Sequence, residues 1–281
     1  MFLFIKQDIA FGMSEKMFGQ NSLLAVYTLW LREMIRFYRQ PSRVLGALGT
    51  PVIFWILIGS GIGTSFRAGS TAVGVGYLHY FFPGTILMVL LFTAIFSTIS
   101  LIEDRREGFL QSVLVAPIPR SSFVLGKILG GTTLAFFQGM VFLCLAPLLG
   151  VPFTPWAWMA TGLVVFVNAF ALTGLGFVVA WRLHSVQGFH AVMNLFLMPL
   201  WFLSGALFPQ EGAPPWLRMV MKCDPLTYGM AALRMALYGG KAELESLPSF
   251  GISILVSLLF GLSMFVLASW SAGRRSIEDF G

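Results

Sequence analysis

Five consecutive charged residues, followed at once by a glycine, form the densest run of ionisable groups in this chain. They are Glu103, Asp104, Arg105, Arg106 and Glu107, and the glycine is Gly108. Carboxylate and guanidinium groups in such a run make ion pairs that can orient a contact with another protein. We therefore expect the run to serve recognition rather than catalysis.

The segment after this run can form a short amphipathic helix. The residues that would share one face of it are Phe109, Leu110, Val113 and Leu114, and Pro117 and Pro119 would end it. Two interpretations are open. In one, the charges solvate a loop and the apolar face lies on lipid. In the other, the apolar face docks into a cleft on a cytoplasmic partner and the charges orient the contact.

Patterns for catalysis and nucleotide binding are absent from the sequence. A chain that hydrolyses ATP needs a phosphate-binding loop such as G-x-x-x-x-G-K-[ST], and neither Gly-Lys pair, at 126–127 and 240–241, is followed by Ser or Thr. The three histidines, at positions 79, 184 and 190, and the two cysteines do not form a ligand or catalytic set. We expect no catalytic residue, metal site or cofactor on this chain, and we expect ATP and Mg to be bound by a partner subunit.

The composition is that of a membrane protein. Of the 281 residues, 57% are apolar and 11% are charged, with a mean hydropathy of +0.82, whereas soluble chains carry about 25% charged residues. These values exclude a soluble globular protein and a disordered chain, and two cysteines are too few for a disulfide scaffold. Basic loops beside apolar spans account for the net charge of +6, so no nucleic-acid partner is expected.

Six stretches are long and apolar enough to cross a bilayer, and none contains Asp, Glu, Lys or Arg. They are Val44–Ser65, Phe81–Ile102, Ile128–Gly150, Ala157–Trp181, Phe189–Phe208 and Ser249–Trp270. The sequence thus predicts an all-α membrane protein with six transmembrane helices. Thirteen of the 18 Lys and Arg residues fall on one side of these spans, which by the positive-inside rule places both termini in the cytoplasm.

Residues 1–43 are predicted to form a cytoplasmic N-terminal region before the six-span region of residues 44–281. On a helical wheel, Trp30 lies at the centre of an apolar face, and Arg32, Arg36 and Arg39 cluster on the opposite face with Arg43. This pattern indicates an interfacial amphipathic helix on the lipid membrane at the cytoplasmic surface. A surface helix of a soluble region is the alternative.

Residues 209–248 are the predicted external segment between the fifth and sixth spans. Many apolar residues, Trp216 among them, stand beside sparse charges and indicate short helices in the outer half of the bilayer. Asp224 and Pro225 mark the turn between two of these helices, and Tyr228 follows in the second. A solvated connecting loop is the alternative.

Polar and aromatic residues of the spans are the candidates for a transport path. Asn168, Asn194 and Gln138 are the deep polar groups, and each either bonds a neighbouring helix or faces a substrate path. Phe202 and Ser204 of the fifth span are further candidates. The path would lie between two copies of the chain, lined by Phe, Met and Trp of the second and fifth spans, a surface that suits an amphipathic or apolar compound.

The order and spacing of these motifs resemble those of the type-2 permeases of ABC transporters. The matching pieces are residues 103–109, Leu114-Val115-Ala116-Pro117, Leu125-Gly126-Lys127, residues 199–209, Pro214-Pro215-Trp216-Leu217, Asp224-Pro225-Leu226-Thr227-Tyr228 and Ala232-Leu233-Arg234. The resemblance covers the chain from about Ser22 to the last span. It departs from the family at Gly108-Phe109, where many members have Gly-Thr.

The resemblance implies the transmembrane permease subunit of an ATP-driven exporter in a bacterial cytoplasmic membrane. The loop Glu103–Arg120 would be its coupling helix on an ATP-binding subunit, with contacts from residues 103–108, Leu110, Leu114 and Pro117. Such permeases work in pairs, so a second copy or a close paralogue is expected as a partner. The cargo is expected to be drug-like or lipid-like; a polysaccharide or lipo-oligosaccharide cargo is the alternative, followed by a secondary transporter that needs no ATPase.

Overall fold

The computed structural model describes residues 22–62, 76–151, 154–239 and 248–274. These residues are almost entirely helical and contain no strand, and six of their helices are long and apolar enough to cross a membrane. The predicted fold class and the number of spans are confirmed. The parts of the predicted regions that lie outside the described residues are 1–21 of the N-terminal region, 63–65 of the first span, 66–75 and 152–153 between predicted spans, 240–247 of the external segment and 275–281 of the C-terminal tail.

Each of the six spanning helices overlaps one predicted span. They are α2 (Pro41–Ile62), α3 (Tyr77–Arg106), α5 (Arg120–Leu143, followed by the 3-10 turn Ala146–Leu149), α6 (Pro155–Arg182), α7 (Val186–Trp201, continued by the π turn Phe202–Ala206) and α10 (Phe250–Arg274). The shorter helices are α4 (Phe109–Val115), α8 (Pro215–Cys223) and α9 (Pro225–Tyr238), with a 3-10 turn at Gln210–Gly212. A further helix precedes α2 over residues 22–38 and is called the N-terminal helix below.

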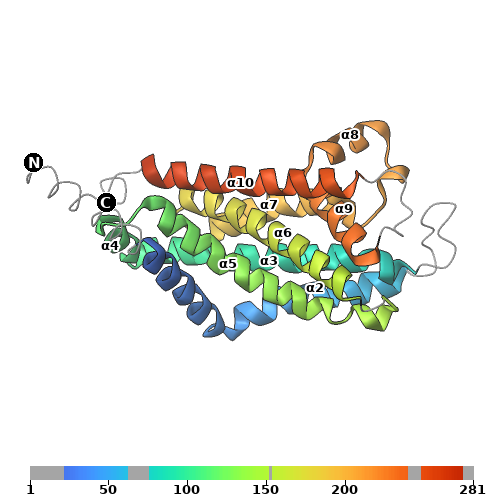
Figure 1. The fold of residues 1–281 in the computed structure, drawn as a ribbon, viewed down its shortest axis with the longest axis horizontal. Coiled ribbons are helices and arrows are strands. Elements are labelled where there is room, and N and C mark those ends of the chain that lie inside the picture. Colours follow the sequence, from blue (N-terminus) through green and yellow to red (C-terminus); the bar gives the residue numbers. More distant parts are fainter. Residues whose placement is uncertain (1–21, 63–75, 152–153, 240–247, 275–281) are drawn as a thin grey trace, which may run out of the picture.

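The spanning helices run along the long axis of an elongated bundle (Figure 1). α3 lies at its centre, surrounded by α2, α5, α6 and α7, and is almost wholly buried, whereas only a small part of α2 and α10 is buried. α4 and the end of α10 lie at one end of the bundle, and α8 lies toward the other end (Figure 1). The second span, predicted to line a path between two copies, is therefore a core helix of this chain.

Small residues and internal hydrogen bonds hold the spans together, as is usual where lipid removes the hydrophobic drive for association. A Cβ atom added at Gly131 of α5 would lie 2.5 Å from Ser97 Oγ in α3 and 2.6 Å from a methyl carbon of Thr173 in α6. Thr93 Oγ1 donates a hydrogen bond of 2.7 Å to Gln138 Oε1. Gln138 thus bonds a neighbouring helix.

The π turn after α7 contains a break at Gly205, whose φ of +83° favours glycine. The Gly205 carbonyl accepts hydrogen bonds from the Tyr80 hydroxyl at 2.9 Å and the Arg234 guanidinium at 2.7 Å. The Tyr77 hydroxyl donates to the Leu207 carbonyl at 3.0 Å. Non-helical backbone at membrane depth is tolerated when its polar groups are paired inside the protein. The hydrogen bond from Arg234 to Gly205 thus connects α9, in the external segment, to the bundle.

Candidate functional site at the charged end of the bundle

The N-terminal helix lies against α5 through a buried face that includes Leu29 and Glu33. Two glycines of α5 allow the close approach. A Cβ added at Gly126 would lie 2.9 Å from Leu29 Cβ, and one added at Gly130 would lie 2.7 Å from Glu33 Cβ. The N-terminal helix is therefore packed on the spans over its whole inward face.

The outward face of the N-terminal helix is apolar. Its exposed large side chains include Leu24, Tyr27, Leu31, Ile35 and Tyr38. Trp30, predicted at the centre of the apolar face, points inward: its indole nitrogen donates a hydrogen bond of 3.0 Å to Thr133 Oγ1. Phe37 is also buried. The arginines Arg32 and Arg36 of this helix face the carboxylate of Asp104 in α3.

Asp104 is the centre of a group of ion pairs. It lies near the end of α3, and its side chain is fully buried. Arg32 donates to both of its oxygens, at 2.9 and 2.7 Å, and Arg36 donates to Oδ1 at 2.6 Å. Lys127 of α5 also binds Asp104 Oδ2. Asp104, predicted as a contact for a partner, is therefore used inside the chain.

A second buried carboxylate, Glu33, completes the inner part of this group. Lys127 Nζ lies 2.5 Å from Glu33 Oε1, and Ser100 Oγ donates to Glu33 Oε2 at 2.6 Å. Paired buried charges avoid the cost of an isolated one. Glu33 is not among the residues predicted from the sequence; the available signal was a lone acid in a segment otherwise rich in arginine.

Glu103 and Glu107 extend the group toward the surface. Arg36 donates to Glu103 Oε2 at 2.9 Å and to Glu107 Oε1 at 3.4 Å, and Arg43 binds Glu103. Glu107 keeps 60% of its side chain exposed. Below, the ion-pair cluster means the eight residues Arg32, Glu33, Arg36, Arg43, Glu103, Asp104, Glu107 and Lys127. The cluster joins four helices: the N-terminal helix, α2 at its first turn, α3 and α5.

Arg105 and Arg106 have different surroundings. Arg105 donates to the carbonyls of Leu183 at 2.8 Å and Trp181 at 2.7 Å, which connects α3 to the end of α6. Its guanidinium also lies over the ring of Trp181. Arg106 is exposed. Of the two, only Arg106 presents its side chain fully to the surface.

The amphipathic helix α4 follows Gly108, which has a φ of +75°. Leu110 and Leu114 are buried within the chain, and the guanidinium of Arg32 lies 3.7 Å from the ring centre of Phe109. The apolar face of α4 therefore packs on the protein itself, and Leu110 and Leu114, predicted as partner contacts, lie behind the exposed surface of α4. The exposed residues of the segment 103–120 are Arg106, Glu107, Gln111, Ser112, Val115 and Pro117.

Comparison with known proteins identifies the family. Residues 25–238 match the sequence profile described as ABC-2 type transporter. The chain belongs to the ABC-2 type transporter family. The matched region contains the N-terminal helix, the ion-pair cluster, α4 and α9.

Two of the relatives of this permease described here are named transport permeases, and a third is named a nodulation protein. The inner membrane transport permease YadH of Escherichia coli K12 is 23% identical over 90% of this chain and 98% of its own length. The transport permease ycf38 of Cyanophora paradoxa is 27% identical over 86% of this chain and 83% of its own. Nodulation protein J of Rhizobium leguminosarum bv. viciae is 26% identical over 75% of this chain and 81% of its own length. The permease is a multi-pass membrane transport protein.

Gln138 bonds Thr93 of α3, and the other four candidate path residues separate into two pairs. Asn168 is buried, and its side-chain nitrogen donates to the Val164 carbonyl at 2.9 Å and the Gly229 carbonyl at 3.5 Å. Ser204 is buried and donates to the Trp201 carbonyl. Asn194 and Phe202 are exposed on the outside of α7. Asn168 and Ser204 are therefore structural contacts within the permease.

The external segment contains the two predicted helices, α8 and α9, with Asp224 between them. Asp224 is buried and caps α9 by accepting a hydrogen bond of 3.0 Å from the Leu226 amide. Burial raises the pKa of Asp224 to about 7, and the Leu226 amide and Thr227 oppose this shift only in part. Pro225 begins α9, and the Tyr228 hydroxyl donates to the Lys222 carbonyl. Trp216 of α8 is largely exposed.

Among the described residues, no group of His, Cys, Asp and Glu could hold a metal ion. The carboxylates of the ion-pair cluster already have cationic partners. The ion-pair cluster can hold the N-terminal helix, α3 and α5 together mechanically.

Proposed function

We propose that this permease is the membrane-spanning subunit of an ATP-driven exporter and that a separate ATP-binding subunit docks on α4. The observation that carries the proposal is the position of α4. It lies between the ends of α3 and α5, beside a cluster of ion pairs that ties both helices to the N-terminal helix. A force applied to α4 would move these helices together.

The docking surface consists of the exposed residues around α4. Arg106 and Glu107 offer charges of both signs, and Val115 offers an apolar side chain that is 68% exposed. Contacts of this kind combine an apolar anchor with charges that fix the orientation of the partner. Leu110 and Leu114 lie on the buried side of α4 and would hold α4 on the bundle.

The cargo path is proposed to run along the outside of α7, between this permease and a second copy. Leu195, Phe196 and Phe202 are exposed there beside Asn194, and the helix carries no Asp, Glu, Lys or Arg over residues 186–206. A surface of large apolar side chains with few polar groups suits an amphipathic, drug-like or lipid-like compound. A polysaccharide or lipo-oligosaccharide would need more polar groups along the same face.

Both termini are proposed to lie in the cytoplasm of a bacterial cell, with α8 and α9 on the outer side of the membrane. The excess of Lys and Arg on one side of the spans supports this orientation. The position of α4 at the same end of the bundle as the end of α10 agrees with it (Figure 1).

The docking surface can be tested by co-purification with the ATP-binding subunit. Val115→Asn should lower the recovered partner about fivefold, the loss expected when one buried contact worth over 1 kcal/mol is removed. Val220→Asn is the matched control, because Val220 is an exposed valine of α8 on the far part of the bundle. Equal recovery with both variants would contradict docking at α4.

Transport itself can be tested in inverted vesicles that contain the permease, the ATP-binding subunit and a fluorescent amphipathic compound. We expect uptake to require ATP and both subunits. Uptake by the permease alone without nucleotide would instead favour a secondary transporter. Uptake of an oligosaccharide but of no amphipathic compound would favour the polysaccharide alternative.

A further inference from the structure

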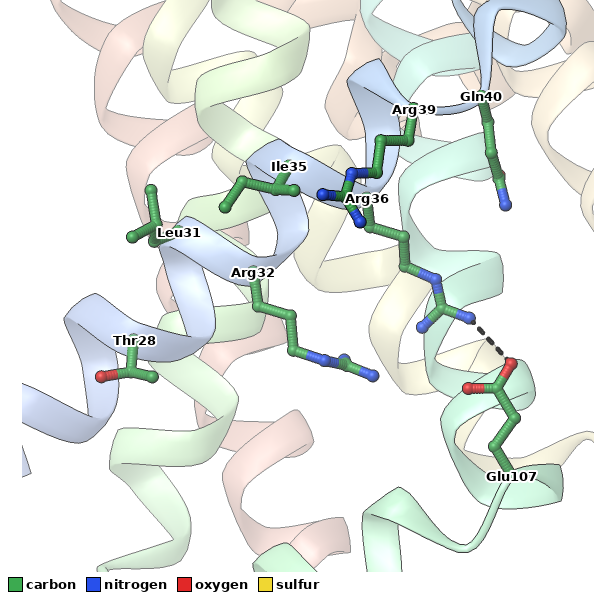
Figure 2. A pocket seen from close by; sticks show the side chains of 8 residues that line it. All are labelled: Thr28, Leu31, Arg32, Ile35, Arg36, Arg39, Gln40 and Glu107. Carbon is green, nitrogen blue, oxygen red and sulfur yellow. Dashed lines mark hydrogen bonds and ion pairs between the residues drawn. The ribbon is translucent and has the colours of Figure 1, made fainter.

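The N-terminal helix borders a hollow of about 680 Å³ at the charged end of the bundle. Its lining residues are Thr28, Leu31, Arg32, Ile35, Arg36, Arg39, Gln40 and Glu107. Figure 2 shows Arg32 and Arg36 extending toward α3, where Glu107 faces Arg36, while Leu31 and Ile35 lie on the other side of the helix. The hollow is thus basic on one side and apolar on the other.

Arg39 gives the hollow a positive charge that the ion-pair cluster does not balance. The cluster contains four basic and four acidic residues and is neutral as a whole. Arg39 lies outside it and is exposed, and its guanidinium has no ion pair or hydrogen bond with any residue in the described part of the chain. An anion in the hollow would therefore meet one cation that no described carboxylate binds.

The apolar side of the hollow continues along the N-terminal helix. Leu31 and Ile35 belong to the same exposed apolar face as Tyr27 and Tyr38. α2, the first spanning helix, begins at Pro41, directly after the hollow. Tyrosine and arginine beside the end of a span are typical of the headgroup region of a bilayer. The hollow thus lies where a phosphate would meet Arg39 and an acyl chain would meet the apolar face.

Gln40 adds a hydrogen-bond acceptor. Its side-chain oxygen is buried and has no hydrogen-bond partner among the described residues. A headgroup hydroxyl can donate to this oxygen, whereas a phosphate oxygen cannot. The lining therefore favours a phosphate diester whose headgroup carries a hydroxyl.

We propose that this hollow binds an anionic glycerophospholipid of the adjacent leaflet, with the phosphate on Arg39, a headgroup hydroxyl on Gln40 and an acyl chain along Leu31 and Ile35. The lipid would fill the surface between the N-terminal helix and α3 and would hold the helix at the membrane. This site is separate from the outward face of α7 proposed for the cargo, and it does not depend on the identity of that cargo.

Lipid affinity can be measured by native mass spectrometry of the purified full-length permease. The probes are phosphatidylglycerol and phosphatidylcholine with the same acyl chains. We expect the permease to bind phosphatidylglycerol more tightly, and Arg39→Gln to weaken that binding about fivefold, the effect of one cation beside an anionic lipid surface. Arg39→Lys should retain most of the affinity, and phosphatidylcholine binding should not change.

Arg182→Gln is the matched control, because Arg182 is an exposed arginine outside the hollow. Thr28→Glu gives a second approach that leaves Arg39 in place, since it adds a negative charge to the lining and should also weaken phosphatidylglycerol binding. Equal effects of the Arg39 and Arg182 variants, or none from Arg39→Gln and Thr28→Glu, would overturn the proposal. So would displacement of the lipid by low millimolar inorganic phosphate, which indicates a site for free anions, or a loss of dimers in Arg39→Gln without a change in lipid affinity, which indicates a protein interface.

Discussion

Arg32 binds both side-chain oxygens of Asp104, at 2.9 and 2.7 Å, although 72 positions of sequence separate the two residues. A planar guanidinium that donates two bonds to one carboxylate fixes both distance and orientation. This pair therefore sets how the N-terminal helix lies on α3, one turn before the chain enters α4. Any motion that α4 receives would reach the N-terminal helix through this contact.

Asp104→Asn should destabilise the permease strongly. The substitution leaves Arg32, Arg36 and Lys127 around a neutral side chain, and removal of one member of a buried ion pair costs about 3–5 kcal/mol. The measurement is thermal unfolding in detergent. Glu107→Gln is the control, because Glu107 is 60% exposed and exposed ion pairs contribute about 0–1 kcal/mol. A similar melting temperature for both variants would show that the buried ion pairs of Asp104 contribute little to the free energy of unfolding.

Alanine in place of two glycines should change stability in opposite directions. Gly130→Ala should destabilise by about 1–3 kcal/mol, because its Cβ atom would lie 2.7 Å from Glu33 Cβ and push the N-terminal helix away. Gly49→Ala should be neutral or stabilising by up to about 1 kcal/mol, since nothing lies within 4 Å of an added Cβ in the exposed helix α2. Thermal unfolding compares the two, and a stabilising Gly130→Ala would place the N-terminal helix elsewhere.

The contact between Asn168 and Gly229 can be tested by a double substitution. A Cβ atom added at Gly229 would lie 1.9 Å from Asn168 Oδ1, so Gly229→Ala should destabilise by about 1–3 kcal/mol. Asn168→Ala in the same chain removes the clash and should recover part of the loss. Additive effects would mean that residues 168 and 229 do not touch. A transport defect of Asn168→Ala at unchanged stability would instead indicate that Asn168 lines the cargo path.

The stability of the permease should depend on pH through Asp224. Because burial raises its pKa to about 7 from the ordinary 3.8, the folded chain holds a proton that the unfolded chain releases between these values. Stability is therefore greatest at acidic pH and falls toward pH 7, by about 1.4 kcal/mol per pH unit at most, and then levels off. Asn can also cap a helix, so Asp224→Asn should remove this component.

The measurement for Asp224 is the melting temperature between pH 4.5 and 8, compared among three chains. Asp224→Asn should flatten the profile and exceed the unmodified permease in stability at pH 8. Glu211→Gln, an exposed acid of the same external segment, should keep the original slope. An unchanged slope in Asp224→Asn would mean that the carboxyl is ionised throughout this range.

The spans and their number could be predicted from the sequence because the property that defines them is local. About twenty consecutive apolar residues are needed to cross a bilayer, and each such stretch is visible without knowledge of its neighbours. The helices α4, α8 and α9 were predictable for a similar reason, since Pro117 and Pro225 limit them locally.

The partners of the charges were not predictable. Lys127 meets Glu33 across 94 positions of sequence, and Arg43 meets Glu103 across 60. A helical wheel separates the arginines from the apolar residues, but a polar face that is buried against carboxylates looks the same on the wheel as one that is solvated. For this reason the wheel alone could not show that Trp30 bonds α5, or that Leu110 is buried within the chain.

By itself, the sequence determined that this chain is a six-span membrane protein with a charged turn after the second span, because length and composition act within each segment. Only the tertiary structure decided that Asp104 binds inward, that Leu114 supports α4 from behind and that Asn168 joins α6 to α9. The physical reason is that these roles depend on the rotation of each helix against its neighbours, and that rotation is fixed by close packing and ion pairs between distant segments.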